Sequence, residues 1–453
     1  MAEITLRQAA QWCGGRVEEK YADITFLGAN NDSRKIQPGQ LFLALQGERD
    51  GHDFIPMAME KGAAAVLCAR PCGDVPAIIV EDPRIALGKI AQGECRRIGM
   101  KVIGVTGSVG KSTTKEMIVT ALEGSFKVAK TPANHNNDIG MPMAILAMDA
   151  DVEVAVLEMG MNHFREIAYL SNIAKPDIAV IINVGTMHIE YLGSREGILQ
   201  AKMEILEGMK ENGICIFNGD DDMLWSRRKD LSKKSRYFGY QNSECGIRAG
   251  NIMTAGGCVR FQVETDSTTF PVELNVEGKH YVLDALAAVS VAMELGISPA
   301  LIQKRLNAFR NMAGRQEIFE KKGCTIIQDC YNAGPESMAA ALEVLGAREG
   351  RRIAVLGDML ELGARTQAEH YRVGRLAAEK AQLLLTYGPN GSRVISGAIT
   401  GGMPESRAMS FDDRDKLAAA LKRVVKPGDT ILFKGSRGMR MELILEAFLA
   451  EET

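Results

Sequence analysis

The sequence predicts an α/β fold with parallel sheets, and three observations support this prediction. Apolar runs with the length of buried strands alternate with helical segments from about residue 100 onward. A glycine-rich turn joins the strand predicted at 102–106 to the helix predicted at 112–123. The same alternation begins again after residue 314. Strands that alternate with helices form parallel sheets with right-handed crossovers, because each helix returns the chain to the same edge of the sheet.

The composition is that of a globular protein with several domains. The chain has 453 residues, which predicts two to four domains of ordinary size. The net charge of −3 argues against a protein that binds nucleic acid mainly through phosphate contacts. The chain does not start with a basic-then-apolar secretory signal, and no apolar run is long enough to span a membrane. The nine cysteines are scattered and lack zinc spacing, so we expect a cytoplasmic protein with reduced thiols.

Residues 1–98 carry strand, loop and helix signals of their own. Thr5 and Gln8 have the spacing of a capping box, so a short helix is predicted that ends near Gly14. The loop segment DSRKIQPGQLFLALQG follows. We therefore predict a small N-terminal α/β domain at residues 1–98.

A central domain is predicted at residues 99–313. Its strands are expected at 102–106, 152–158, 177–184 and 213–218. Its helices are expected at 112–123, 164–172, 195–210 and 281–295. Ser298 and Pro299 supply the cap and the first-turn proline of a further helix.

A third α/β domain is predicted at residues 314–453. Its expected strands are the segments CTIIQD, RRIAVLGD, QLLLTYG and DTILFKG. In such sheets, ligands bind beyond the carboxyl ends of the strands.

The turn in KVIGVTGSVGKSTTKEM has the features of a phosphate-binding loop. Gly107 and Gly110 let the backbone turn tightly and direct N–H groups at an anion, and the helix that follows adds its positive end. Lys111 can reach the β- and γ-phosphates, and Ser112 can bind Mg²⁺. Val105 stands where the longer form of this motif has its first glycine. A glycine-rich helix start without phosphate is the alternative.

Candidate metal ligands follow the next strands. Glu158 ends the strand predicted at 152–158, where a carboxylate faces the phosphate loop. His188 lies just beyond the strand predicted at 177–184, and Lys202 lies in the helix predicted at 195–210. Taken alone, each could equally be an ordinary structural or solvent-exposed residue.

The motifs together resemble those of the Mur ligase family. They occur in the family's order from residue 31 to about residue 442: TGSVGKSTT, ANHNNDIGMP, LEMG, NVGTMHIEYLGSREGILQAKMEI, GRQEIFE, DCYNAGP, LGDMLELG and KGSRGMRME. The resemblance implies three domains: a central P-loop-type ATPase with a parallel sheet, a small N-terminal substrate domain and a Rossmann-like C-terminal domain. It is strongest to members that join D-alanyl-D-alanine to UDP-N-acetylmuramoyl-tripeptide through an acyl phosphate, giving the pentapeptide precursor of peptidoglycan for the cell wall. A cytoplasmic monomer with small-molecule substrates is expected.

The resemblance also implies roles for individual residues. ATP would contact Gly107, Ser108, Val109, Gly110, Lys111, Ser112, Thr113, His280, Arg315, Asp329, Tyr331 and Asn332. Two Mg²⁺ ions would be held by Ser112, Glu158, His188 and Lys202, with Lys202 converted by CO₂ to a carbamate. The catalytic residues would be Lys111, Glu158, His188, carbamylated Lys202 and Arg315. The UDP-substrate would contact Asp32, Ser33 and Arg34, and its muramoyl-peptide part Asn136 and Asn137. The loops LGDMLELG and KGSRGMRME are candidates for binding the incoming dipeptide.

Three residues depart from the family's pattern. Tyr281 and Asp284 stand in GKHYVLDA where the family has H-N-x-x-N, and Gly334 stands in YNAGP where YNANP is usual. These departures affect the expected adenine contacts rather than the class of reaction.

Three other functions remain as alternatives. One is the family's third-residue-adding ligase, whose D-N/D-P-R motif is absent after residue 314. Another is folylpolyglutamate synthetase, which would lack the UDP-type segment that begins at Asp32. The third, from another class, is a nucleotide-hydrolysing switch that moves a partner.

Overall fold

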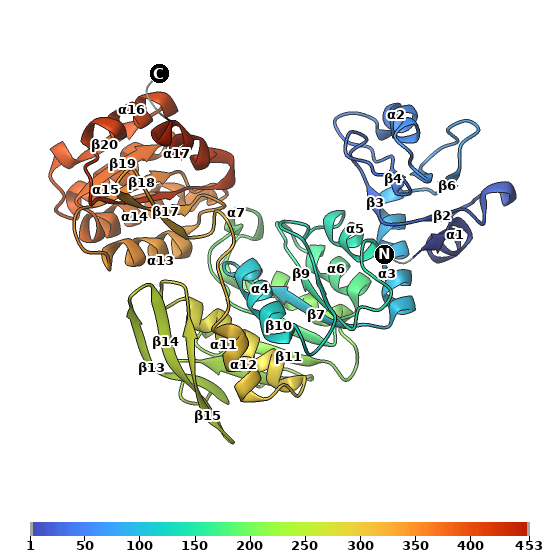
Figure 1. Ribbon diagram of the computed structural model, residues 1–453, viewed down its shortest axis with the longest axis horizontal. Helices are drawn as coiled ribbons and strands as arrows, with labels where there is room; N and C mark the ends of the chain where they lie inside the picture. Colours follow the sequence, from blue (N-terminus) through green and yellow to red (C-terminus); the bar gives the residue numbers. More distant parts are fainter. Residues whose placement is uncertain (1–2, 451–453) are drawn as a thin grey trace.

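The computed structural model describes residues 3–450. Within this range the strands form a two-stranded sheet and three larger sheets, which we call the N-terminal, central and C-terminal sheets. Figure 1 shows the blue N-terminal domain and the orange-red C-terminal domain against different parts of the central domain. The boundaries at 98/99 and 313/314 stay predictions. Among residues 3–450, no helix combines the length and apolar character needed to cross a membrane.

The N-terminal sheet is parallel and has the order β3-β4-β5-β6. Its strands are β3 (Ala29–Asn30), β4 (Leu41–Leu43), β5 (Ala65–Cys68) and β6 (Ala77–Ile79). The two-stranded sheet pairs β1 (Ile4–Thr5) with β2 (Thr25–Phe26). Helix α1 (Leu6–Cys13) begins at the predicted capping box of Thr5 and Gln8 and ends at Gly14, whose φ is 73°. Helix α2 (Ile55–Glu60) lies near the other end of this domain (Figure 1).

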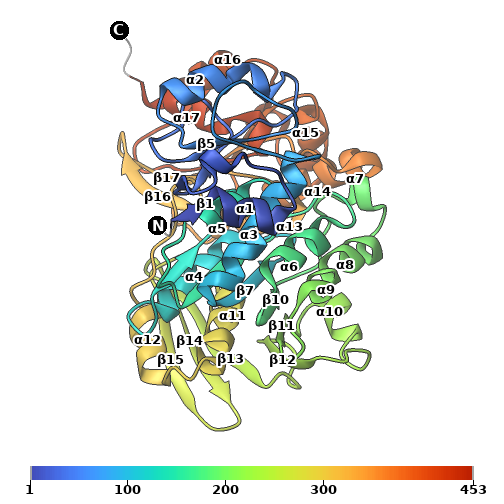
Figure 2. The ribbon, with the colours of Figure 1, turned by 90° about the vertical axis from the view of Figure 1, so that its right-hand side faces the viewer.

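Helix α3 (Pro83–Ile98) contacts both the N-terminal and the central domain. It packs on α1 from one side and on α5 (Gly140–Leu146) and α6 (Glu166–Ala174) from the other (Figure 2). Two of its glycines allow the close approach. A Cβ at Gly93 would lie 2.3 Å from the ring of Trp12 in α1, and one at Gly88 would lie 2.2 Å from the hydroxyl of Tyr169 in α6. One hydrophobic core therefore runs through both domains.

The central sheet has the order β15-β14-β13-β12-β11-β10-β7-β9-β8. Its strands are β7 (Lys101–Thr106), β8 (Val128–Lys130), β9 (Val154–Glu158), β10 (Ile178–Ile181), β11 (Ile214–Asn218), β12 (Lys234–Gly239), β13 (Ile247–Ala255), β14 (Cys258–Thr265) and β15 (Thr269–Leu274). Pairing is parallel from β8 to β13 and antiparallel from β13 to β15. No strand was predicted at residues 234–274. These strands alternate in burial, and β13 joins β14 through the tight turn of Gly256 and Gly257.

The helices of the central domain follow the predicted order, with two corrections and with three short helices at 140–146, 189–192 and 222–226 that were not predicted. They include α4 (Lys111–Leu122), α7 (Ile189–Leu192), α8 (Arg195–Met203), α9 (Ile205–Gly208), α10 (Asp222–Ser226), α11 (Tyr281–Glu294) and α12 (Pro299–Leu306). The single helix predicted at 195–210 is wrong, because the chain breaks at Glu204 into α8 and α9. The predicted side-chain cap of α12 is also wrong, because Ser298 occupies the cap position without a capping hydrogen bond.

The C-terminal sheet has the order β16-β17-β21-β18-β19-β20, and only the β16–β17 pair is antiparallel. Its strands are β16 (Glu317–Lys321), β17 (Cys324–Asp329), β18 (Arg352–Gly357), β19 (Leu383–Tyr387), β20 (Ala408–Phe411) and β21 (Thr430–Lys434). Its helices are α13 (Pro335–Gly346), α14 (Thr366–Lys380), α15 (Gly391–Thr400), α16 (Arg414–Val424) and α17 (Met441–Leu449). Separate hydrophobic cores lie on its two faces, as in doubly wound folds.

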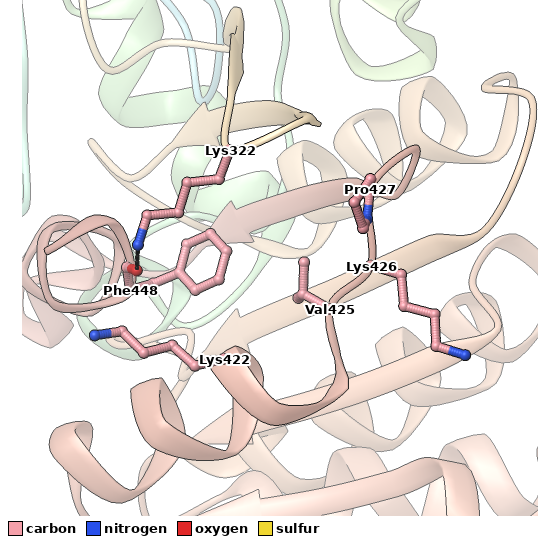
Figure 3. A pocket seen from close by; sticks show the side chains of 6 residues that line it. All are labelled: Lys322, Lys422, Val425, Lys426, Pro427 and Phe448. Atoms are coloured by element: carbon pink, nitrogen blue, oxygen red, sulfur yellow. Dashed lines mark hydrogen bonds between the residues drawn. The ribbon is translucent and has the colours of Figure 1, made fainter. Parts of the chain in front are cut away.

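A small pocket in the C-terminal domain lies beside the end of α17 and is lined by three lysines (Figure 3). Lys322 Nζ donates to the carbonyl of Phe448 at 3.0 Å, and Lys422 Nζ donates to the carbonyl of Ala450 at 3.1 Å. Two of the lysines thus satisfy carbonyls that α17 leaves unpaired at its end.

Candidate active site

A cavity of about 580 Å³ is lined by residues of the central and C-terminal domains. It opens beyond the carboxyl ends of the parallel strands, where ligands bind in α/β sheets. It brings together most of the residues expected at ATP and metal: Ser108, Val109, Gly110, Lys111, Ser112, Thr113, Glu158, His188, His280, Arg315, Asp329, Tyr331 and Asn332. Asn136 and Asn137 also line it. The cavity lining does not include Gly107, Lys202, Asp32, Ser33 or Arg34.

The phosphate loop connects β7 to α4. Gly110 precedes the helix with a φ of 84°, a conformation that glycine adopts without strain. The N–H groups of Ser108 and Val109 donate to Asn183 Oδ1 at 2.9 and 3.0 Å. Lys111 Nζ donates to the carbonyl of Gly107 at 2.9 Å, so its ammonium lies folded over the loop. Burial is the main reason that the pKa of Lys111 is below its ordinary value.

Ser112 and Glu158 are in direct contact at the centre of the cavity. Ser112 Oγ donates to Glu158 Oε2 at 2.6 Å, and Asn136 Nδ2 donates to Glu158 Oε1 at 2.8 Å. Arg315, which comes from the segment between the two domains, donates through Nη2 to Ser112 Oγ at 2.8 Å. The guanidinium therefore lies at the hydroxyl that is expected to hold Mg²⁺.

His188 joins this site to the C-terminal domain. Its Nδ1 lies 2.6 Å from Glu361 Oε2, which belongs to the loop after β18. This contact with His188 is the main cause that lowers the pKa of Glu361. A second polar contact lies beside it, where Glu336 Oε1 accepts from both the N–H and the hydroxyl of Thr186 at 2.9 Å.

Lys202 lies on α8 and is 1% exposed. Burial, followed by the nearby charge of Lys111, lowers its pKa well below the ordinary value, and Asp221 opposes this shift. Within residues 3–450, its ammonium has no hydrogen-bond partner. Burial therefore disfavours the charged form of this side chain.

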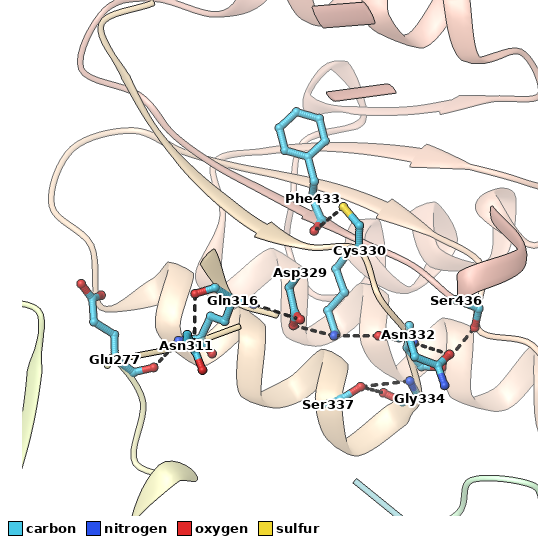
Figure 4. A network of polar contacts seen from close by, with 12 residues as sticks. Glu277, Asn311, Gln316, Asp329, Cys330, Asn332, Gly334, Ser337, Phe433 and Ser436 are labelled. Carbon is cyan, nitrogen blue, oxygen red and sulfur yellow. Dashed lines mark hydrogen bonds and ion pairs between the residues drawn. The ribbon is translucent and has the colours of Figure 1, made fainter. Parts of the chain in front are cut away.

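Polar contacts connect the segment between the domains to the nucleotide side of the cavity (Figure 4). Gln316 has a φ of 47°, donates through its side chain to the carbonyl of Glu277 and donates through its N–H to Asp329 Oδ1 at 3.3 Å. Lys434 Nζ lies 2.6 Å from Asp329 Oδ2 and donates to the carbonyl of Asn332 at 3.0 Å. The guanidinium of Arg315 and the ring of Tyr331, which are 4.0 Å apart, lie beside this network.

Comparisons with known proteins agree with this architecture. Three models match the chain: "Mur ligase family, catalytic domain" at residues 23–95, "Mur ligase middle domain" at 105–292 and "Mur ligase, glutamate ligase domain" at 314–437. The UDP-N-acetylmuramoyl-tripeptide–D-alanyl-D-alanine ligase of Bacillus subtilis is 37% identical, over 98% of both chains. The ligase of the same name from Escherichia coli is 36% identical, over 99% of this chain and 98% of its own.

The chain belongs to the Mur ligase family.

Solved structures of this family have the same fold. A crystal structure of MurF from Acinetobacter baumannii aligns with a TM-score of 0.91 at 31% identity, covering 100% of both chains. The MurF ligase from Thermotoga maritima in complex with ADP aligns with a TM-score of 0.84 at 32% identity, covering 93% of this chain and 97% of its own. The predicted family and its three-domain α/β fold are therefore confirmed.

The residues that depart from the usual Mur ligase motifs are packed into the structure. The hydroxyl of Tyr281 accepts from Asn311 Nδ2 at 2.6 Å. Asp284 Oδ1 accepts from Thr114 Oγ1 at 2.5 Å, and burial raises the pKa of Asp284 to about 7. A Cβ at Gly334 would lie 2.1 Å from Met187 Sδ, so a larger residue there requires Met187 to move. Next to Tyr281, burial lowers the pKa of His280 to about 4, which keeps its imidazole neutral.

The residues expected at the UDP-substrate lie in the N-terminal domain of this Mur ligase. Asp32 holds Arg34 through two hydrogen bonds of 2.9 Å, and this contact lowers the pKa of Asp32 to about 2. Ser33 is buried, and its Oγ lies 3.4 Å from Met57 Sδ. The role of the three residues in substrate binding stays a prediction.

Asn183 and Glu336 line the cavity of this Mur ligase although no role was predicted for either. Asn183 binds the phosphate loop, and its Nδ2 donates to the carbonyl of Val109 at 3.0 Å. Glu336 and Glu361 contact the central domain from the C-terminal domain. The position of Asn183 after a parallel strand was a usable signal, whereas no local pattern reveals a contact between two domains.

Proposed function

We propose that this Mur ligase joins D-alanyl-D-alanine to UDP-N-acetylmuramoyl-tripeptide, with conversion of ATP to ADP and phosphate. The observation that carries the proposal is the contact of the phosphate loop, Glu158 and Arg315 in one cavity between two domains. The substrates follow from full-length relatives that carry this activity in their names. The product is the pentapeptide precursor of peptidoglycan. The enzyme thus serves cell-wall synthesis, cell shape and division in the bacterial cytoplasm, and we propose that it acts as a monomer.

The donor atoms at Ser112 and Glu158 suit Mg²⁺. This ion prefers oxygen ligands and is often held by one or two carboxylates together with water and nucleotide phosphates. Among residues 3–450, no three His, Cys, Asp or Glu side chains form a metal site by themselves. This fits an ion that arrives with the nucleotide, and two such ions are proposed with His188 and Lys202 as further ligands. Mg²⁺ would neutralise the negative charge of the ATP phosphates.

Lys202 supports the proposal of a carbamate. Its amine is buried, which lowers its pKa and disfavours the charged form, and the neutral form is the one that reacts with CO₂. The amine nitrogen bonds to the carbon of CO₂ and releases one proton, and the anionic product replaces a cation with an oxygen donor. A Lys202→Ala variant is expected to lose most activity and to regain part of it with added acetate. A free lysine in a crystal structure, together with no rescue by acetate, would contradict this role.

The residues of the cavity can then act in sequence on the two substrates. The terminal carboxylate of the tripeptide attacks the γ-phosphorus, ADP leaves, and an acyl phosphate forms. Lys111 and Arg315 carry positive charge toward the transferred group, which is most of what phosphoryl transfer requires of a protein. The amine of D-alanyl-D-alanine attacks the acyl carbon, and phosphate leaves. Contacts from the C-terminal domain, such as Glu361 to His188, exclude water from the acyl phosphate.

Phosphate release tests the proposed function. The enzyme is expected to release phosphate from ATP only when UDP-N-acetylmuramoyl-tripeptide and D-alanyl-D-alanine are both present, and the product should have the mass of the pentapeptide precursor. Oxygen-18 in the tripeptide carboxylate should appear in the released phosphate. Release with ATP alone, or release stimulated by a protein, would favour a nucleotide-dependent switch. Activity only with another amino component or a folate would favour another ligase of the family.

A further inference from the structure

Lys115 is a buried lysine for which the proposed chemistry has no use. It lies on α4 behind the phosphate loop, its side chain is 1% exposed, and it is not part of the cavity lining. A buried ammonium is costly unless it is paired and hydrogen-bonded. Its position therefore requires a reason beyond filling space.

The partners of this ammonium converge on the base of the candidate metal site. Lys115 Nζ donates to the carbonyl of Thr131 at 2.6 Å. It also lies 3.9 Å from Glu158 Oε2 and 3.5 Å from Glu116 Oε1. Glu158 is the acid that accepts a hydrogen bond from Ser112 in the cavity, and Lys115 lies near the same carboxylate oxygen.

Thr131 connects the same two residues through a second atom. It is fully buried just after β8, and its Oγ1 accepts the N–H of Glu158 at 3.0 Å. Lys115 therefore donates to the carbonyl of Thr131, and the hydroxyl of Thr131 accepts from the N–H of Glu158. Thr131 and Lys115 thus contact the backbone and the carboxylate of Glu158, and Ser112 and Asn136 donate to the same carboxylate.

We propose that Lys115 is a positioning residue that fixes the Glu158 carboxylate for Mg²⁺. This inference rests on the proposed function, in which Glu158 is a ligand of Mg²⁺. Glu158 is 2% exposed, and Lys115 places a positive charge 3.9 Å from its desolvated carboxylate. Groups that orient a metal ligand contribute to metal affinity although they do not touch the metal.

The test compares Lys115→Met with the wild type in Mg²⁺-dependent binding of ADP, measured by calorimetry. Lys115→Met keeps the length and apolar stem of the side chain and removes the charge and the donor. We expect it to raise the Mg²⁺ concentration for half-maximal enhancement of ADP binding about tenfold or more. Binding of ADP without Mg²⁺ and the KM for the UDP-substrate should not change. In ligation, kcat should fall at limiting Mg²⁺ and recover at high Mg²⁺.

Two further variants give the matched controls. Lys115→Arg restores a cation and a donor, and should bring the Mg²⁺ requirement most of the way back. Glu116→Gln removes the other acid beside the same ammonium, and should leave the requirement unchanged because Glu116 does not contact Glu158. An unchanged or lower Mg²⁺ requirement in Lys115→Met would overturn the proposal, since a mere electrostatic competitor of Mg²⁺ gives a lower one.

Thr131→Val decides the question if Lys115→Met does not fold. It keeps the shape of the side chain and removes only the acceptor of the Glu158 N–H. We expect a higher Mg²⁺ requirement, and no change would overturn the proposal.

The binding measurement also separates this proposal from the proposed function. ADP binding does not depend on ligation, so a wild type that binds Mg²⁺ and ADP but joins no peptide would contradict only the proposed function.

Discussion

At the scale of single residues, the active site combines groups that balance one another's charge. Arg315 reaches Ser112, and Ser112 and Asn136 both donate to Glu158. The carboxylate of Glu158 therefore has hydrogen-bond partners from the protein itself. Burial makes such contacts strong and makes the loss of one partner costly.

Asp284 gives a prediction about pH. Burial raises its pKa to about 7, above that of an unfolded aspartate, so the folded state holds a proton that the unfolded state releases. The associated stability is fully present below about pH 4 and is lost as pH rises through about 7. Asp284→Asn removes this dependence and can keep the bond to Thr114. Its gain in unfolding free energy over the wild type should grow from pH 5 to 7, reach a few kcal/mol, and stay constant above.

Urea unfolding at several pH values measures this difference. Asp266→Asn, at an exposed position, serves as the control and should follow the wild type at every pH. Parallel curves for Asp284→Asn and the wild type between pH 5 and 8 would show that Asp284 is not protonated in the folded enzyme.

Site residues could be predicted from the sequence where their position depends on a local sequence motif. Ser112 and Glu158 could be assigned because a loop between strand and helix, and a carboxylate at the end of a neighbouring parallel strand, must face the same ligand. The contact of Glu361, in the loop LGDMLELG, with His188 could not be predicted, because it depends on how two separately folded domains meet. The assigned roles stay predictions even where the residues line the cavity.

At the scale of elements, the side chain of Glu204 between two helices caps the start of a third helix of the central domain. Glu204, between α8 and α9, accepts the N–H of Arg165 at 2.7 Å and that of Ala168 at 3.2 Å. It thus satisfies donors that α6 leaves unpaired at its start. This long-range role explains why the helical pattern of residues 195–210 did not reveal the break.

Replacing Glu204 should destabilise the central domain. Glu204→Ala leaves the N–H groups of exposed Arg165 and buried Ala168, at the start of α6, without this partner, and we expect a loss of about 1–2 kcal/mol, as for other lost caps. Glu207→Ala is the matched control, since Glu207 forms only an exposed ion pair with Arg165 and should cost about 0–1 kcal/mol. Chemical unfolding followed by circular dichroism measures both. Equal effects of the two variants would contradict the capping role.

The strands were predictable where they are buried on both faces. Runs such as that of β10 are entirely apolar and follow the α/β rhythm, whereas β13 to β15 have alternating burial and short turns. The sequence pattern of a half-exposed antiparallel strand is weaker than that of a buried parallel strand, because about half of its residues are polar like those of a loop.

At the scale of the whole molecule, the domains are joined in two different ways. The N-terminal and central domains share a hydrophobic core through α3. The central and C-terminal domains meet at the cavity through polar contacts, including Arg315 to Ser112, Glu336 to Thr186 and Glu361 to His188. Polar interfaces of this kind allow relative motion of domains.

Removing the two glutamates should loosen the C-terminal domain without unfolding it. In the variant Glu336→Ala/Glu361→Ala, we expect X-ray scattering to give a larger radius of gyration, and hydrogen exchange at residues 184–188 to be faster. A non-hydrolysable ATP analogue with Mg²⁺ should reverse both changes. Glu369→Ala is the control, because Glu369 bonds to Arg372 within its own helix. Unchanged scattering and exchange in the double variant would mean that these contacts do not hold the domain.

The shared helix α3 packs the first two-thirds of the enzyme, its N-terminal and central domains, around one hydrophobic core. At Gly88 and Gly93 the backbone of α3 lies directly against Tyr169 and Trp12, so a side chain at either position would clash. The proposed site for the UDP-substrate and the phosphate loop are therefore parts of one packed unit. If the substrate binds there, we expect a constant distance between its uridine end and its reactive carboxylate, which would limit the length of the peptide that the enzyme extends.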